Sequence, residues 1–400
     1  MKKIVIIGNS ASGVRAAQTI RKKDSSSTIT VISQEKHFPY LKPRLLDYLA
    51  GEIKKDDLFY LNNNFYLDNN IEFISEKSVT RINEKKKIVF LDDKSNIDYD
   101  ILLIASGATN KIPEIKGTYK YGVFEIRSLE DIDKILQIIP VVSDVCIIGS
   151  GSIGLRAAVS FRKRNLDVTV VTKSKFALSS YLDEYASSII KRHLDDFGVR
   201  FIFDQDVIEI IGEQEARAIK LESGKVISSS LILIAKGSIP NLNFIKDTSI
   251  KINKGITVDE NFKTNIPGIY AAGQACEAYN FILNKYDINY DWQGALSQGE
   301  IVGENIVENP IKYEGFINIK MLNLLGLGIV SLGKFNLESG LEESKLIDNK
   351  NSIYKRIIIQ DNKIVGAVLI GDLINKDNIL KLLKEKQDIS NIKNTIFDQN

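Results

Sequence analysis

Residues 4–13 read IVIIGNSASG, and residues 145–154 read VCIIGSGSIG. In both stretches an apolar run leads directly into a glycine-rich turn. A short run that is apolar at every position predicts a strand buried on both faces, as in a parallel sheet. The glycines allow the backbone at the start of the next helix to approach a pyrophosphate group. One such pattern is weak evidence, but two of them about one domain apart predict that the chain holds two dinucleotides. That arrangement usually serves hydride transfer between nicotinamide and flavin.

The two glycine patterns are not equally complete. The second has glycine at all three positions, Gly149, Gly151 and Gly154, whereas the first has Ser10 at the middle one. The pyrophosphate normally approaches the backbone closely at that point, so a large side chain would weaken the motif. Serine is small enough to be tolerated, and we expect both turns to bind a nucleotide.

The residues after the second strand of each unit should select the nucleotide. The run 28–32 is followed by Glu35, where an acidic residue is expected to bind the adenosine ribose hydroxyls. The run 166–171 is followed by Lys173 and Lys175. Because a basic residue there accommodates the 2′-phosphate of NADPH, the lysines favour NADPH or weak discrimination between the two nucleotides. The alternative is that both lysines merely face solvent.

A third motif, together with two short segments that follow strand-like runs, completes the pattern. Residues 269–274 read IYAAGQ, a flavin-type motif. The strand-like runs 101–104 and 231–234 end in Ala105-Ser106-Gly107 and Ala235-Lys236-Gly237. The same order of strand, glycine turn, helix and strand therefore occurs twice, and the second copy interrupts the first.

We predict an α/β fold with two Rossmann-like nucleotide-binding domains, the second inserted in the first, and a small α+β domain at the C-terminal end. The first domain is expected at 1–112 and 241–309, the second at 113–240 and the third at 310–400. From Pro310 onward the pattern changes to short strands and a terminal helix, and about 90 residues are enough for a small domain.

The composition excludes several classes of function. The chain has 400 residues, 44% of them hydrophobic, and a formal net charge of +2, so no strong field attracts nucleic acid or an anionic membrane. Its two cysteines, Cys146 and Cys276, and its two histidines lack the spacing of a metal site. No apolar run approaches the ~20 residues of a membrane helix, and the apolar N-terminal stretch leads into a glycine turn, unlike a signal peptide. We expect a cytoplasmic protein that binds no nucleic acid, membrane or metal ion.

The motifs occur in the order that is typical of flavoprotein reductases with two dinucleotides. Over residues 1–308 the chain resembles this family, the FAD- and NAD(P)-dependent pyridine nucleotide oxidoreductases. Residues 38–45, FPYLKPRL, resemble the rubredoxin and ferredoxin reductase branch. Residues 319–397 resemble the C-terminal domain of NADH–rubredoxin reductases and the flavin half of NADH-dependent nitrite reductases.

The resemblance implies two sets of cofactor contacts. Lys42 takes the place of an arginine that contacts the FAD pyrophosphate, and Gln274 takes the place of an aspartate that accepts a ribityl hydroxyl. A glutamine carbonyl can still accept that bond. The implied FAD contacts are Gly8, Ser10, Ala11, Gly13, Glu35, Lys42, Ala105, Ser106, Gly107, Gly273 and Gln274. The implied NAD(P)H contacts are Gly149, Gly151, Ser152, Ile153, Gly154, Lys173, Lys175, Lys236 and Gly237.

Three charged residues, Arg44, Asp47 and Arg156, are candidates near the flavin by the same resemblance. Relatives carry Lys at the place of Asp47 and Glu at the place of Arg156, and in them the two side chains pair beside the flavin. Either the charges are exchanged in this chain, or both are ordinary helix residues. The sequence shows no acid–base pair, so no catalytic side chain is assigned.

Thiol chemistry is not expected. Relatives that reduce disulfides or peroxide carry a cysteine near residues 42–46, where this chain reads KPRLL, and both reactions need a thiolate. Cys146 belongs to a buried strand and is expected to be inert. Cys276 is also expected to be packed, with the alternative that it lies near a helix N-terminus and has a lowered pKa.

The expected activity follows from these observations. NAD(P)H passes a hydride to FAD, and the electrons pass to a small iron–sulfur carrier such as rubredoxin or ferredoxin. One alternative is an NAD(P)H oxidase that uses oxygen. Another is a redox-responsive flavoprotein that acts mainly by binding a partner. The chain is expected to be a monomer or a homodimer.

Overall fold

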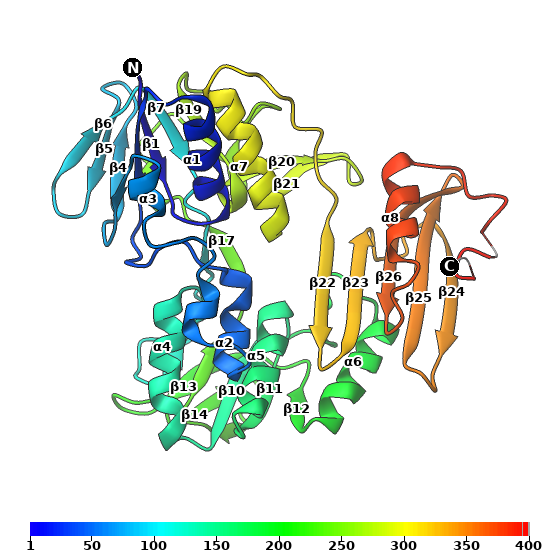
Figure 1. Cartoon of the computed structure of the whole chain (residues 1–400). Coiled ribbons are helices and arrows are strands. Elements are labelled where there is room, and N and C mark those ends of the chain that lie inside the picture. Colours follow the sequence, from blue (N-terminus) through cyan, green and yellow to red (C-terminus); the bar gives the residue numbers. More distant parts are fainter. Residues whose placement is uncertain (394, 399–400) are drawn as a thin grey trace. The chain divides into compact units, whose positions relative to one another are not determined.

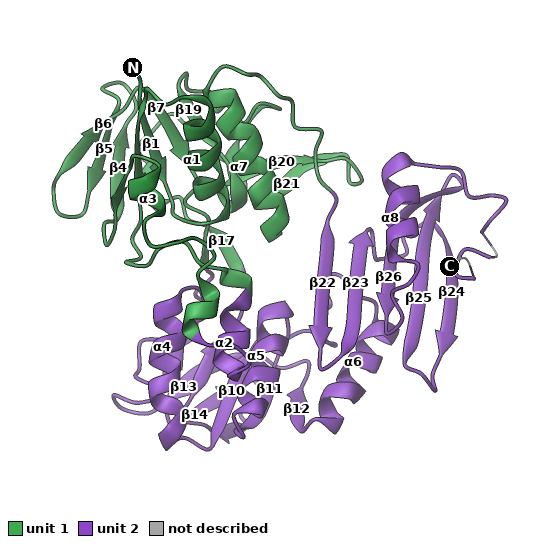
Figure 2. Ribbon diagram, in the orientation of Figure 1, with its two compact units in different colours: residues 1–43, 55–109, 238–316 green, residues 44–54, 110–237, 317–400 purple. Residues whose placement is uncertain are grey.

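The described part of the computed structural model, residues 1–393 and 395–398, divides into two compact units (Figure 1, Figure 2). Unit 1 contains residues 1–43, 55–109 and 238–316, and unit 2 contains 44–54, 110–237 and the described residues from 317 onward. Each unit holds one of the glycine turns. The three predicted domains, the last of which includes the undescribed residues 394, 399 and 400, remain a prediction.

Unit 1 is built on a five-stranded parallel sheet in the order β19-β7-β1-β2-β3. These strands are β1 (Lys3–Ile7), β2 (Thr28–Ile32), β3 (Ile71–Ile74), β7 (Ile101–Ile104) and β19 (Ile269–Ala271). Every residue of β7, and every residue of β1 after Lys3, is buried. An unbroken apolar run is what a central strand of a parallel sheet requires, because both of its faces are covered.

Two helices of unit 1 pack closely through small residues. They are α1 (Ala11–Lys23) and α7 (Trp292–Ile306). A Cβ on Gly299 would lie 2.4 Å from the carbonyl oxygen of Ser12, so only glycine allows this approach. The remaining elements of unit 1 are α3 (Phe65–Asp68), β4 (Val79–Asn83), β5 (Ile88–Leu91), β6 (Asn96–Asp98), β18 (Ile256–Thr257), β20 (Cys276–Asn280) and β21 (Lys285–Ile288).

Unit 2 repeats the parallel sheet, in the order β12-β11-β10-β16-β9. These strands are β9 (Val123–Phe124), β10 (Asp144–Ile148), β11 (Asp167–Val171), β12 (Val199–Ile202) and β16 (Ile232–Ile234). Residues 110–237 of this unit also contain the helices α4 (Leu129–Ile138), α5 (Ser152–Lys163) and α6 (Glu184–Asp196). In the same part, β13 (Val207–Ile211), β14 (Ala218–Leu221) and β15 (Val226–Ser228) form an antiparallel sheet. The strands β8 (Ala108–Asn110) and β17 (Ser238–Pro240) lie where the chain changes unit.

The short helix α2 (Leu45–Ala50) belongs to unit 2 although it comes early in the sequence. It packs against α5, where the Ser160 hydroxyl donates to the Leu46 carbonyl at 2.8 Å. Arg164, at the end of α5, donates to the Leu49 carbonyl, also at 2.8 Å. Side chains of α5 and of its C-cap residue therefore bind two backbone carbonyls of α2.

The C-terminal part of unit 2 is an antiparallel sheet in the order β22-β23-β26-β25-β24, with α8 (Lys376–Glu385) packed against β26 (Figure 1). The strands are β22 (Ile319–Leu324), β23 (Leu327–Gly333), β24 (Glu342–Asp348), β25 (Ile353–Gln360) and β26 (Lys363–Ile370). Together with the two parallel sheets, this part confirms the predicted α/β class with two Rossmann-like units and a C-terminal α+β part. None of the helices in the described residues is long and apolar enough to cross a bilayer.

Candidate dinucleotide-binding sites

The first glycine turn is closed tightly against the exit of β7. The Gly8 N–H donates to the Ile32 carbonyl at 2.9 Å, and a Cβ on Gly8 would lie 2.1 Å from the Ala105 carbonyl oxygen. Gly8 also has a φ of +120°, which favours glycine. The backbones of the turn and of Ala105-Ser106-Gly107 are therefore in direct contact. Ser106 is held by a hydrogen bond from its hydroxyl to the Asn241 carbonyl at 2.9 Å.

The third motif lies beside the first turn of α1. A Cβ on Gly273 would lie 2.5 Å from the Ser12 hydroxyl oxygen. The Gly273 N–H donates to the side-chain oxygen of Gln298, a residue of α7 that is fully buried, at 2.8 Å. The side-chain nitrogen of Gln274 donates to the Tyr290 carbonyl at 3.2 Å. The sequence did not indicate Gln298. It lies in a helix that is distant in sequence from Gly273, and a side chain that accepts from a backbone N–H produces no recognisable motif.

Two predicted FAD contacts, Glu35 and Lys42, pair with each other. The Lys42 ammonium lies 2.5 Å from a carboxylate oxygen of Glu35, and the side chain of each residue is 20% exposed. The Tyr40 hydroxyl donates to the second carboxylate oxygen of Glu35. The three residues therefore form one polar cluster after β2, and the sequence pattern had not indicated Tyr40.

The second glycine turn has the same geometry in unit 2. The Gly149 N–H donates to the Val171 carbonyl at 2.8 Å, and a Cβ on Gly149 would lie 2.3 Å from the Ala235 carbonyl oxygen. Over the middle glycine, Gly151, a Cβ would meet no atom within 4 Å. The space at this point fits a pyrophosphate group that approaches the backbone.

The helices after both glycine turns begin without a side-chain cap. The N-cap residues Ser10 of α1 and Gly151 of α5 make no side-chain hydrogen bond to the first turn of the helix. Ser128, Asp183 and Asp291 cap α4, α6 and α7 with their side chains, whereas α2, α3 and α8 also lack a side-chain cap but do not follow a glycine turn. The backbone N–H groups at the starts of α1 and α5 are therefore available to an anion, and the helix dipole favours a negative charge there.

Basic residues dominate the strand ends in unit 2. Lys173 and Lys175 are exposed and have no ion-pair partner among the described residues. Lys236 forms an ion pair of 2.5 Å with Asp206. Ile153 is 46% exposed, and Gly237 has a φ of +90° with no atom within 4 Å of its Cβ position. The end of β11 thus differs from the end of β2, where Glu35 is the charged acceptor.

A segment that the sequence pattern did not single out contacts the second glycine turn. The Leu178 N–H donates to the Ser150 carbonyl at 3.0 Å. The Tyr181 hydroxyl lies 2.6 Å from the hydroxyl of Ser152, the first residue of α5. Tyr181 is 9% exposed, and this burial raises the pKa of its phenol above the ordinary value.

Asp47 and Arg156 form an ion pair between α2 and α5. Arg156 Nη2 lies 2.8 Å from Asp47 Oδ1, and Arg44 Nε lies 3.3 Å from Asp47 Oδ2. The Arg156 and Asp47 side chains are 25% and 28% exposed. Both line a cavity of about 500 Å³, which reaches the turn between β22 and β23. The exchanged charges are thus paired within unit 2, and the position of this pair relative to a flavin stays a prediction.

Both cysteines are buried and unsuited to thiolate chemistry. Burial, with a smaller contribution from Asp144, raises the pKa of Cys146 to about 12. Cys276 begins the strand β20, and burial raises the pKa of its thiol as well. The alternative that Cys276 lies near a helix N-terminus with a lowered pKa is wrong, because the short helix before it ends at Ala275 and directs carbonyls toward it. In the described residues no group of three His, Cys, Asp or Glu side chains is placed to hold a metal ion.

Comparison with known proteins identifies the family. The model of the pyridine nucleotide-disulphide oxidoreductases matches residues 2–299, and that of the rubredoxin NAD+ reductase C-terminal domain matches residues 319–387. The chain is 28% identical over 403 residues to the assimilatory nitrate reductase electron transfer subunit of Bacillus subtilis, covering 99% of this chain and 51% of that one. It thus spans about half the length of the Bacillus subtilis relatives that it matches.

A second relative matches over its whole length. The NADH-rubredoxin oxidoreductase of Clostridium acetobutylicum is 30% identical over 391 residues, covering 98% of this chain and 96% of that one. The crystal structure of NADH:rubredoxin oxidoreductase from that organism is 28% identical with a TM-score of 0.82, and 98% of each chain is covered. The chain therefore belongs to the pyridine nucleotide-disulphide oxidoreductase family.

Proposed function

We propose that this chain passes electrons from NADPH through FAD to a small iron–sulfur protein such as rubredoxin or ferredoxin. One observation carries the proposal: both helices after the glycine turns, α1 and α5, begin without a side-chain cap. Among the described helices, α1 and α5 are the two uncapped ones that directly follow a glycine turn, and two such starts suit two pyrophosphates. When bound, FAD accepts the hydride of a nicotinamide and can release its electrons one at a time.

Residues of unit 1 would hold FAD. The N–H groups from Ser10 to Gly13 would donate to the pyrophosphate, and Gly273-Gln274 would lie at the ribityl chain. Glu35 would accept the adenosine ribose hydroxyls, and Lys42 would approach the pyrophosphate. Because Lys42 and Glu35 pair with each other at 2.5 Å, Lys42 would also orient the Glu35 carboxylate beside the ribose.

Residues of unit 2 would hold the nicotinamide dinucleotide. The N–H groups at Ser152 and Ile153 would donate to its pyrophosphate, and the strand exit at Lys236-Gly237 would lie alongside it. Lys173 and Lys175, exposed and without an ion-pair partner in the described residues, would bind the 2′-phosphate of NADPH. An acidic residue that would repel this phosphate is absent from residues 172–175.

The proposed electron acceptor rests on the chemistry of the two cysteines and on the similarity of the C-terminal part to a known family. The buried thiols Cys146 and Cys276 cannot supply a thiolate at neutral pH, so disulfide and peroxide reduction by an enzyme thiol are disfavoured. The C-terminal part matches the rubredoxin NAD+ reductase model. We also propose that Arg44, Asp47 and Arg156 lie near the flavin, and that the protein is cytoplasmic and a monomer or a homodimer.

Anaerobic turnover tests the function. The purified protein should be yellow with one noncovalent FAD, and NADPH should bleach it. With rubredoxin or ferredoxin added, NADPH oxidation should greatly exceed the rate with air as the acceptor. A colourless protein that takes up no FAD would refute the cofactor assignment. Rapid turnover with oxygen alone would indicate an oxidase, and no turnover with any acceptor would indicate a flavoprotein that acts by binding a partner.

A further inference from the structure

The segment 178–183 lies between the second glycine turn and the C-terminal sheet of unit 2. Toward the turn, the Leu178 N–H donates to the Ser150 carbonyl at 3.0 Å, and the Tyr181 hydroxyl lies 2.6 Å from the Ser152 hydroxyl. These contacts fix the segment to the residues that would face the pyrophosphate of the nicotinamide nucleotide.

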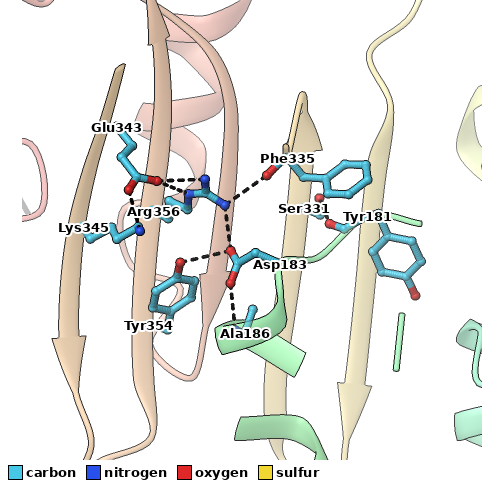
Figure 3. Close-up of polar contacts among 9 residues, drawn as sticks. All are labelled: Tyr181, Asp183, Ala186, Ser331, Phe335, Glu343, Lys345, Tyr354 and Arg356. Carbon is cyan, nitrogen blue, oxygen red and sulfur yellow. Dashed lines mark hydrogen bonds and ion pairs between the residues drawn. The ribbon is translucent and has the colours of Figure 1, made fainter. Parts of the chain in front are cut away.

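The other side of the segment is held by three side chains of the C-terminal sheet (Figure 3). The Ser331 hydroxyl, on β23, donates to the Tyr181 carbonyl at 2.6 Å. From β25, the Tyr354 hydroxyl and Arg356 Nη1 both donate to Asp183 Oδ2, at 3.0 Å and 2.9 Å. The C-terminal part is thus hydrogen-bonded to both Tyr181 and Asp183. Asp183 also caps α6, because its side chain accepts from the Ala186 N–H at 3.0 Å.

The hydrogen bonds of Arg356 to this segment are charged and largely buried. The Arg356 side chain is 6% exposed and lies between Asp183 and Glu343, to which it donates at 2.8 Å. Burial alone would raise the pKa of Glu343, but hydrogen bonds and charges from Lys345 and Arg356 outweigh it and lower the pKa. A buried cation held by two carboxylates is strongly specified in position, because loss of one partner leaves an uncompensated charge. The geometry of the segment therefore depends on the C-terminal part.

We infer that the C-terminal part of unit 2 positions Tyr181 against the second glycine turn, and that Ser331, Tyr354 and Arg356 thereby set the affinity for the nicotinamide dinucleotide. The Tyr181 hydroxyl orients the Ser152 side chain at the first position of α5, where an incoming phosphate meets uncapped N–H groups. Tyr181 is a positioning residue in this scheme. The inference rests on the proposed function of this turn.

Lys355 provides a matched control next to Arg356 in β25. Its side chain is 4% exposed and pairs with Asp372 at 2.7 Å, and it also donates to Asn375. It therefore anchors a buried charge within the C-terminal part, and its described hydrogen bonds and ion pair go to Asp372 and Asn375, not to residues 178–183. Lys355→Met should lower the thermal stability about as much as Arg356→Met does, without changing the position of Tyr181.

The test measures the dissociation constant of NADP+ by titration calorimetry on the FAD-containing full chain. We expect Tyr181→Phe, Ser331→Ala and Arg356→Met each to weaken binding by about threefold to tenfold. The first two each remove one hydrogen bond, and Arg356→Met removes the charged hydrogen bond to Asp183 that holds the segment. FAD content should stay unchanged, and in turnover KM for NADPH should rise while kcat stays constant. Lys355→Met should bind NADP+ like the original chain.

Three results would overturn the inference. Unchanged NADP+ binding in Tyr181→Phe and Ser331→Ala would show that the segment does not affect the site. If Lys355→Met and Arg356→Met weaken NADP+ binding equally, the loss of affinity comes from a general destabilisation of the C-terminal part. Failure of the original chain itself to bind NADP+ or NAD+ would refute the proposed function, which the same titration distinguishes from the first two results.

Discussion

The two nucleotide-binding units share their backbone geometry and differ in the side chains that follow the second strand. Gly8 and Gly149 donate to the Ile32 and Val171 carbonyls at 2.9 Å and 2.8 Å. A Cβ on either glycine would lie 2.1 Å or 2.3 Å from the carbonyl oxygen of an alanine at the neighbouring strand exit. The turn geometry is therefore common to both units and cannot by itself select FAD or a nicotinamide nucleotide.

The selection must come from the residues at the strand ends. After β2 the charged acceptor is Glu35, held by Tyr40 and Lys42. After β11 the chain offers Lys173 and Lys175, both exposed. A carboxylate accepts the hydroxyls of a ribose, whereas ammonium groups attract a phosphate. Under the proposed function, one backbone scaffold would bind two different ligands because a few side chains outside the glycine turn differ.

The largest effect should follow from filling the glycine turns. In Gly13→Ala the new Cβ would lie 2.0 Å from the Gly8 carbonyl oxygen, and in Gly154→Ala 2.1 Å from the Gly149 carbonyl oxygen. Such overpacking typically costs about 1–3 kcal/mol and shifts the backbone. Gly13→Ala should be purified without FAD. Gly154→Ala should keep FAD, but its reduction by NADPH in a stopped-flow experiment should slow by roughly tenfold or more.

Each glycine variant is the control for the other. The absorbance of bound flavin reports on unit 1, and the rate of flavin bleaching reports on unit 2. Loss of FAD from both variants would mean that the two turns are not independent sites, and the comparison between the units would then fail.

A smaller effect is expected at the strand end of unit 2. Lys173→Glu together with Lys175→Glu should reverse the preference from NADPH toward NADH. Charge-assisted hydrogen bonds to a phosphate contribute roughly 1.5–3 kcal/mol, so the ratio of kcat/KM for the two nucleotides should change by about tenfold to a hundredfold. Steady-state kinetics with both nucleotides and a fixed acceptor measures the ratio.

The control for this double variant is Lys225→Glu with Lys350→Glu. Both are exposed lysines of unit 2 outside the glycine turn, and the change in net charge is the same. A ratio that moves equally in both double variants would indicate a long-range charge effect. An unchanged ratio in the first would show that Lys173 and Lys175 only face solvent.

The sequence predicted those parts of the two units that depend on local pattern. The apolar runs 4–7 and 101–104 became neighbouring buried strands, because a strand covered on both faces must be apolar throughout. The ion pair of Asp47 with Arg156 agrees with one of the two alternatives left open, an exchange of charges, and that alternative came from the resemblance to relatives and not from local pattern.

The supporting contacts could not be predicted. The Ser331 hydroxyl donates to the Tyr181 carbonyl 150 positions away in the chain, and Gln298 accepts from the Gly273 N–H. One partner in each bond is a backbone group, which every residue carries and no sequence pattern records. The pairing of Lys42 with Glu35 escaped prediction for another reason: each residue was assigned a ligand, and two opposite charges that approach a common site also attract each other.

The smallest effect on function is expected at the cysteines, one in each unit. Cys276 belongs to unit 1 and Cys146 to unit 2, and both are buried. Since neither supplies a thiolate at neutral pH, Cys146→Ala and Cys276→Ala should leave the oxidation of the reduced enzyme by rubredoxin nearly unchanged in stopped-flow experiments. If either variant abolishes this step while FAD remains bound and reducible by NADPH, a thiol relay operates and the proposed mechanism is wrong.

The buried thiol of Cys146 should also affect how the stability of the protein depends on pH. Burial raises the pKa of Cys146 from 9.0 to about 12 in the folded chain. Between these values the thiol of the unfolded chain ionises while that of the folded chain stays protonated, so the free energy of unfolding contributed by Cys146 is complete below pH 9 and decreases as the pH rises toward 12. Urea unfolding at pH 8 and at pH 10.5 should therefore show a larger loss of stability in the original chain than in Cys146→Ala. Equal losses would mean that the thiol of Cys146 reaches solvent in the folded protein, and the argument that excludes a thiolate in unit 2 would no longer hold.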